Sequence, residues 1–200
     1  MADVFIYLKK VYPFLLILIP VYIVFRIVRI HTMKKRCTVS TARRETALFS
    51  LFAVLTVIFS MTLTRDGTIA DLSMSISHGS EYYNFIPFKA VKTCFAYIGT
   101  AQFASYFVIN WLGNILLFVP VGFLIPLTLR CYAFKTIAVC FASSAFIETF
   151  QIFLPRMTDI DDVIMNTAGA AVGCLIYFIA RGKEGKRLKK FRIYKENELP

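Results

Sequence analysis

Long apolar segments, separated by short polar stretches, are the feature that most constrains the fold of this chain. Five of them are rich in Leu, Ile, Val, Phe and Ala, and they cover residues 4–28, 46–64, 106–129, 133–154 and 162–180. A helix needs about 20 apolar residues to cross the hydrocarbon core of a bilayer, which is the length of these segments. The mean hydropathy of +0.64 and the hydrophobic content of 58% exclude an ordinary soluble domain. We therefore predict an all-α fold, a polytopic membrane helical bundle with about five transmembrane helices.

The distribution of positive charge predicts an orientation for this bundle. The formal net charge is +11, and if the connection 29–44 is cytoplasmic, seventeen Lys and Arg fall on the inner side and six on the outer side. Cytoplasmic connections are enriched in Lys and Arg, so we expect a multi-pass bacterial cell membrane protein with its N-terminus outside and its C-terminus in the cytoplasm. The enrichment of Lys and Arg on the cytoplasmic side explains the basic net charge, so we do not expect nucleic-acid binding. The domain division is a transmembrane domain at 1–180 and a basic cytoplasmic tail at 181–200 that lies on anionic lipid.

The longest connection, residues 65–105, is extracytoplasmic in this orientation and joins the second and third spans. It contains the aromatic sequence EYYNFIPF at Glu81–Phe88. Tyr and Phe at this density beside a proline are typical of a membrane interface, and long loops often carry function. We expect a short interfacial helix within residues 88–107.

Polar residues within or beside the apolar segments are the candidate functional residues. An amide or a charge in hydrocarbon is costly, so a polar group retained there indicates a site. In the predicted orientation all of them fall in the outer half of the membrane or just outside it. They are Asn110, Asn114, Glu148, Gln151 and Asn166 in the spans, and Arg156, Asp159, Asp161 and Asp162 in the loop PRMTDIDD.

The polar residues of the third and fourth spans fit two interpretations each. Asn110 and Asn114 are four residues apart on one helix face, where they could hydrogen-bond a neighbouring helix or a ligand. Glu148 and Gln151 also share a face. An unpaired Glu148 would be a general acid or base, whereas pairing with Arg156 would make it a structural ion pair.

The acidic loop before the fifth span leaves several chemistries open. Asp159 and Asp162 suit the start of a helix, where carboxylates meet free N–H groups. Together with Asp161 they also fit a divalent cation such as Mg²⁺ or Ca²⁺, or a cationic ligand, while Arg156 fits a phosphate. The residues do not choose among these chemistries, and they do not identify a cofactor.

Small residues continue the same face of the fifth span below Asp162 and Asn166. Gly169 and Gly173 form a GxxxG pattern, which permits close contact between helices. We therefore expect this helix to pack tightly while it directs Asp162 and Asn166 into the bundle.

Two sequences in this region resemble a known family. They are NWLGNILLFVPVGFLIPL and FIETFQIFLPRMTDIDDVIMNTAGAAVGCLIY, and with NFIPF at residues 84–88 they are similar to the VanZ-like family of bacterial membrane proteins. The resemblance covers residues 84–177. It implies a small integral membrane protein whose founding type is linked to low-level resistance to teicoplanin rather than vancomycin. The matching positions are Asn114, Pro120, Glu148, Gln151, Arg156, Asp159, Asp161, Asp162 and Asn166.

Two functional hypotheses follow. In the first, the protein binds an amphiphile in an outer polar pocket: a membrane lipid, a lipid-linked cell-wall precursor or the lipoglycopeptide itself. The pocket would be lined by Asn110, Asn114, Gln151, Arg156, Asp159, Asp161 and Asn166. In the second, it is an intramembrane enzyme acting on such a lipid, with Glu148 and Asp162 as catalytic residues and the Asp159, Asp161 and Asp162 group holding a metal or activating water.

Overall fold

The computed structural model describes residues 2–63, 83–96, 98–100, 111–129, 131–152, 158–189, 191 and 193–195. Within them the chain is almost entirely helical, as predicted. In chain order the elements are α1 (Ala2–Lys35), β1 (Thr38–Ser40), α2 (Ala42–Leu63), β2 (Tyr83–Asn84), α3 (Lys89–Ala96), α5 (Gly113–Leu129), α6 (Ala133–Gln151), β3 (Thr158–Asp159), α7 (Ile160–Lys189) and β4 (Ile193–Lys195).

Four helices of the described part are long and apolar enough to cross a membrane. The candidate spans are Val11–Lys35, Ala42–Met61, Ala133–Gln151 and Ile160–Gly182. The apolar helix α5, with 17 residues, is shorter. The start of the third predicted span, residues 106–110, lies outside the described residues. These helices confirm a membrane bundle, while the number of spans and their orientation stay predictions.

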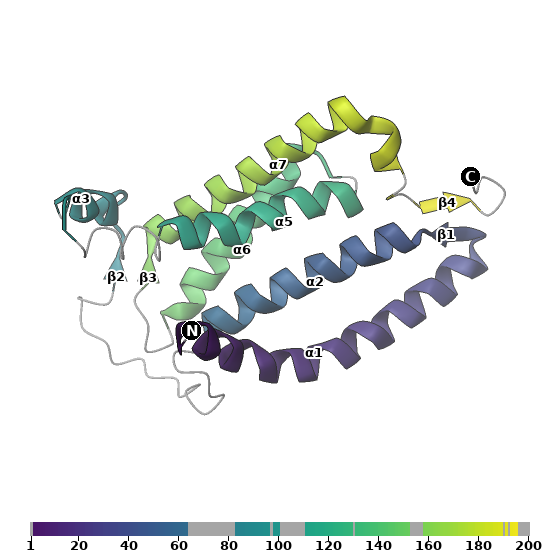
Figure 1. The fold of residues 1–200 in the computed structure, drawn as a ribbon, viewed down its shortest axis with the longest axis horizontal. Coiled ribbons are helices and arrows are strands. Elements are labelled where there is room, and N and C mark those ends of the chain that lie inside the picture. The colour runs from purple at the N-terminus through teal and green to yellow at the C-terminus, as the bar shows by residue number, and fades with distance from the viewer. Residues whose placement is uncertain are drawn as a thin grey trace.

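Helices α5, α6 and α7 pack together, α2 packs on α5, and α1 forms the outer edge beside α2 (Figure 1). The apolar window of α1 is 0% buried within the protein, and many of its large side chains, among them Leu16, Val21 and Ile27, are exposed. Pro13 and Pro20 lie inside α1, and this helix is visibly curved (Figure 1). Proline removes a backbone hydrogen bond and bends a helix, which is the curvature expected from the sequence.

The tightest contact joins α5 and α7 through glycines. A Cβ added to Gly169 would overlap the carbonyl of Ile115, one added to Gly173 would overlap the carbonyl of Val119, and one added to Gly122 would overlap the carbonyl of Ala170. Close backbone approach of this kind replaces hydrophobic driving force as a source of helix association in lipid. The predicted tight packing of the GxxxG face is confirmed.

A buried apolar cluster extends from this contact to α2 and α6. Its members are Leu51, Ile58, Phe118, Val121, Ile125, Cys140 and Ala170. They come from α2, α5, α6 and α7, so the core belongs to these four helices and not to α1. These four helices thus form the frame that positions the polar residues.

Two small sheets mark opposite ends of the bundle (Figure 1). Strands β2 and β3 pair in parallel, with Tyr83 beside Thr158 and Asn84 beside Asp159. Strands β1 and β4 pair antiparallel at the other end, with Val39 beside Tyr194. We call the two ends the β2–β3 end and the β1–β4 end.

Part of the basic tail predicted at 181–200 has regular secondary structure. Helix α7 continues past residue 180 to Lys189, and β4 then pairs with the connection between α1 and α2. This pairing places the C-terminal segment and that connection at the same end of the bundle, as the charge distribution predicted.

Candidate functional site

Polar side chains line one face of α7, and successive residues along this face contact different elements of the protein. Asp159 precedes the helix, and Asp162 and Asn166 follow at spacings of three and four residues, which keeps them on one face. The residues that they contact, directly or through a shared partner, lie in β2, α5 and α6. We call the whole group the polar cluster: Asn84, Asn114, Ser144, Glu148, Gln151, Asp159, Asp161, Asp162 and Asn166.

Asp159 begins α7 as its N-cap. Its Oδ1 accepts a hydrogen bond from the backbone N–H of Asp161 at 2.9 Å, which satisfies a free donor of the first helical turn. The same oxygen accepts a second hydrogen bond from Nδ2 of Asn84 at 2.8 Å. The capping role that the sequence predicted for Asp159 is therefore present, and it is combined with a contact to β2.

Glu148 connects α6 to this cap. Its Oε2 accepts the backbone N–H of Asp159 at 2.9 Å, and Gln151, in the amide orientation that satisfies both side chains, donates to both carboxylate oxygens at 3.2 Å. Thr158 donates its hydroxyl to the carbonyl of Glu148 at 3.4 Å. Only 6% of Glu148 and 6% of Gln151 is exposed. These contacts fix the carboxylate at the C-terminal end of α6.

Asp161 holds the segment that follows β2. Its Oδ1 accepts the backbone N–H of Phe88, and Asp161 itself is buried. Phe88 has a positive φ of 62°, a backbone conformation that a bulky residue rarely adopts. The carboxylate is thus the group that stabilises an otherwise unfavourable turn.

Two further hydrogen bonds continue the polar cluster into the bundle. Nδ2 of Asn114 on α5 donates to Oδ1 of Asp162 at 2.6 Å. One turn deeper, Nδ2 of Asn166 donates to Oγ of Ser144 on α6 at 2.8 Å. Oδ1 of Asn166 is buried and has no hydrogen-bond partner among the described residues. A buried acceptor without a donor costs free energy, so this oxygen is the atom of the cluster at which a ligand donor would bind most favourably.

The structure brings together most of the residues that the sequence singled out. Asn114, Glu148, Gln151, Asp159, Asp161, Asp162 and Asn166 all belong to the cluster, whereas Asn110 and Arg156 lie outside the described residues. The candidate divalent-cation site does not take shape in the described part of the chain, where no group of three His, Cys, Asp or Glu side chains is arranged to hold a metal ion. Asp159, Asp161 and Asp162 instead accept hydrogen bonds from four donors of this chain, two of them at Asp159.

Sequence reasoning missed Ser144 and Asn84. Ser144 is 0% exposed and lies one turn before Glu148 on α6, so the spacing of Ser144, Glu148 and Gln151 along one face was the available signal. Asn84 was noted only as the first residue of NFIPF. No pattern in the sequence predicted that it would pair with Asp159, because 75 residues separate the two.

Burial raises the pKa of the Asp159 carboxyl above its ordinary value of 3.8, and the charge of nearby Asp161 adds to this effect. The hydrogen bonds from Asp161 and Asn84 and the charge of Lys89 act in the opposite direction. Desolvation is the largest of these effects, so the charged form of Asp159 is held at a net cost.

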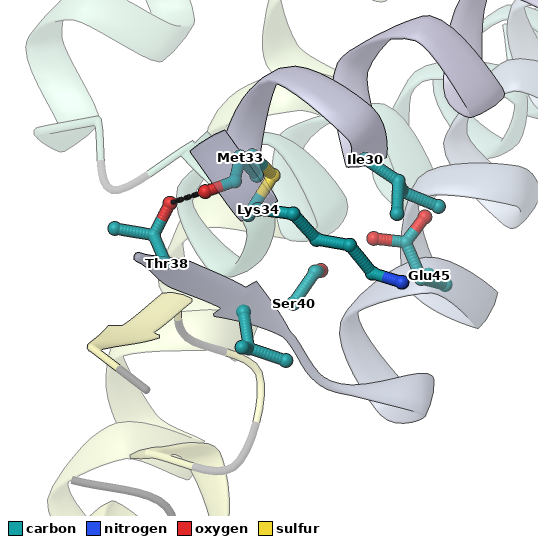
Figure 2. A pocket seen from close by; sticks show the side chains of 7 residues that line it. Ile30, Met33, Lys34, Thr38, Ser40 and Glu45 are labelled. Carbon is teal, nitrogen blue, oxygen red and sulfur yellow. Dashed lines mark hydrogen bonds between the residues drawn. The ribbon is translucent and has the colours of Figure 1, made fainter. Parts of the chain in front are cut away.

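A pocket at the β1–β4 end is separate from the polar cluster. It is lined by Ile30, Met33, Lys34, Thr38, Val39, Ser40 and Glu45, and Figure 2 shows the Lys34 side chain reaching toward Glu45. Beside it, Nε of Arg26 on α1 donates to the Glu45 carboxylate on α2 at 2.9 Å. This contact ties the two helices together. The pocket shares no residue with the polar cluster at the other end.

The fold and the cluster define the class of the protein: a polytopic helical membrane protein with hydrogen-bonded polar side chains gathered at one end of the bundle. The chain belongs to the VanZ/LLP1 family, whose model matches residues 47–181, more than half of the sequence. The match begins within α2 and includes the whole polar cluster, while α1 lies outside it. No curated protein and no solved structure matches the chain significantly.

Proposed function

We propose that the polar cluster binds the head group of an amphiphile at the outer face of the cell membrane. The candidates are a membrane lipid, a lipid-linked envelope precursor and a lipoglycopeptide such as teicoplanin. The observation that carries the proposal is the buried Oδ1 of Asn166, which has no donor among the described residues and lies beside a row of carboxylates and amides. A ligand hydroxyl, amine or amide would supply the missing donor.

The position of the cluster supports a ligand with an apolar tail. The cluster lies at one end of the candidate span Ile160–Gly182, where head groups meet hydrocarbon. Large apolar side chains are exposed at the same end, among them Phe85 and Ile86. An amphiphile could therefore keep its tail in the bilayer while its polar part reaches the cluster.

The hydrogen bonds of the carboxylates favour binding over catalysis. Glu148 accepts a backbone N–H and, in the orientation given above, the Gln151 amide, and Asp162 accepts the Asn114 amide. A carboxylate that accepts hydrogen bonds from donors of the protein is held in place as an acceptor, and it is less able to exchange a proton with a substrate. The enzyme hypothesis, with Glu148 and Asp162 as catalytic residues, remains the alternative that the experiment must exclude.

The first experiment measures teicoplanin and vancomycin susceptibility in a sensitive Gram-positive host. It compares wild type with Asn166→Ala, Glu148→Gln and Asp162→Asn at equal membrane levels. Leu116→Ala, at a position on α5 that is 62% exposed, is the matched control. We expect the wild type and the control to protect against teicoplanin alone, Asn166→Ala to lose protection, and the two isosteric variants to keep part of it because they retain acceptor oxygens.

Two results would contradict this expectation. Full protection by Asn166→Ala would remove the cluster from ligand binding. Complete loss in both Glu148→Gln and Asp162→Asn, at normal expression, would favour the enzyme. If the wild type itself gives no protection, teicoplanin is not the ligand, and the same four variants are then compared for binding of extracted cell-envelope lipids.

A further inference from the structure

A second surface stands out beside the polar cluster. Large apolar side chains are exposed on residues 85–98, a segment outside all the candidate spans of the described chain. Their exposed fractions run from 51% to 62%, and they are Phe85, Ile86, Phe88, Phe95 and Ile98. In water such a patch would be unfavourable, so it indicates a surface that is covered in the native setting.

The depth of this segment is fixed by its contacts. Asn84 bonds to Asp159 and the backbone of Phe88 bonds to Asp161, and both aspartates lie at the start of the candidate span Ile160–Gly182. In Figure 1, β2 and α3 extend beyond the ends of α5 and α7 and to one side of them. If α7 crosses the bilayer, the segment lies at the level where head groups meet hydrocarbon.

The residues of the segment are of the kinds found where lipid head groups meet hydrocarbon. Lys89 and Lys92 are exposed next to the apolar side chains, and lysine at an interface directs its charge toward lipid phosphate. The ring of Phe95 contacts the ring of Trp111 edge-on, with 6.5 Å between the centroids. Trp111 is the single Trp of the chain and lies two residues before the start of α5, and Trp is enriched at membrane interfaces.

We propose that residues 85–98 form an interfacial anchor that inserts Phe85, Ile86, Phe88 and Phe95 into the outer-leaflet interface of the bilayer. The occupant of this apolar surface is phospholipid, because exposed aromatic rings and flanking lysines complement acyl chains and phosphate respectively. The anchor is joined to the polar cluster by the Asn84–Asp159 and Phe88–Asp161 hydrogen bonds. It therefore holds the cluster at a fixed depth whether or not a ligand is bound.

Fluorescence depth measurements test this proposal without any ligand, so the outcome is independent of the proposed function. The full chain carrying Trp111→Phe receives a single new Trp through Phe85→Trp or Ile86→Trp and is reconstituted in phosphatidylcholine–phosphatidylglycerol vesicles. Phe141→Trp, at a position on α6 that is 53% exposed within a candidate span, is the lipid-facing reference. N-acetyltryptophanamide is the aqueous reference.

We expect both probes to be quenched by phospholipids brominated on the upper acyl carbons as strongly as the Phe141→Trp reference, and to be shielded from aqueous acrylamide relative to N-acetyltryptophanamide. Quenching by acrylamide at the level of N-acetyltryptophanamide, with no effect of brominated lipid, would overturn the proposal. Protection from both quenchers would also overturn the proposal, because the surface would then be covered by protein and not by lipid. If the covering protein is a second copy of this chain, diluting the protein with excess lipid would remove the protection.

Discussion

Single side chains of the polar cluster serve the fold and the candidate site together. Oδ1 of Asp159 accepts hydrogen bonds from Asn84 and from the first turn of α7, while the backbone N–H of Asp159 donates to Glu148. Three separate segments therefore converge on one residue. A substitution here changes the position of neighbouring groups as well as its own chemistry, so isosteric variants are the informative ones.

The raised pKa of Asp159 predicts a pH dependence. Because the folded protein disfavours its charged form, the stability contribution of this group is present below the ordinary carboxyl pKa of 3.8 and is lost as the pH rises through the raised value. Asp159→Asn keeps an oxygen for both donors and cannot ionise. We expect thermal unfolding in detergent micelles to show a smaller loss of stability in this variant than in wild type as the pH increases across that interval. If the stability of wild type and of Asp159→Asn changed with pH in the same way, the raised pKa of Asp159 would be contradicted.

At the scale of elements, the contact between α5 and α7 sets the geometry of the site. Asn114 and Asp162 bond beside the point where the two backbones approach closely, at Ile115 and Gly169. The deeper contacts of Gly122 and Gly173 hold the same pair of helices together. Small residues at these positions thus determine the spacing of polar groups at the helix ends.

Gly→Ala substitutions test this dependence. In Gly169→Ala and Gly173→Ala the new methyl group overlaps a backbone carbonyl of α5, and overpacking of this kind costs about 1–3 kcal/mol. Gly182→Ala, on the same helix with nothing within 4 Å, is the control, and it is expected to stabilise α7 by about 0.5–1 kcal/mol. The measurement is the thermal unfolding midpoint in detergent. Equal midpoints for Gly169→Ala and Gly182→Ala would show that the helices separate without cost.

At the scale of the whole molecule, the two ends of the bundle differ in chemistry. The β2–β3 end carries the polar cluster and the exposed apolar side chains of residues 85–98. The β1–β4 end carries the Arg26–Glu45 contact and the exposed basic residues Lys34, Lys35 and Arg36. This asymmetry matches the charge bias that predicts the β1–β4 end to face the cytoplasm.

Cysteine labelling in intact cells checks this orientation. One variant keeps exposed Cys37, beside β1, as its sole cysteine, and another carries Thr100→Cys in a background without native cysteines. A membrane-impermeant maleimide is expected to label Thr100→Cys from outside and to reach Cys37 only after permeabilisation. The reverse pattern would show that the polar cluster faces the cytoplasm and would exclude the proposed outer-leaflet ligand.

Much of the fold was predictable because a bilayer imposes simple constraints on sequence. Apolar segments of spanning length had to be helices, and the structure has α2, α6 and α7 close to the expected ranges. The short helix expected within residues 88–107 is present as α3 at Lys89–Ala96. The strands β1 and β4 were not predicted, because three-residue strands carry no periodic signal and their pairing joins positions far apart in the chain.

The sequence by itself determined the membrane class, the family and most of the side chains of the candidate site, since polar groups in apolar helices and local motifs are visible residue by residue. Only the tertiary structure decided how those side chains are used. Asp159 bonds to Asn84, Asp161 holds Phe88, and Asn166 bonds to Ser144 with one oxygen left without a partner among the described residues. Each of these contacts depends on how segments distant in sequence are placed against one another. The glycines of α7 show in the sequence that a close contact is possible, but only the fold shows that α5 is the partner and where the two backbones meet.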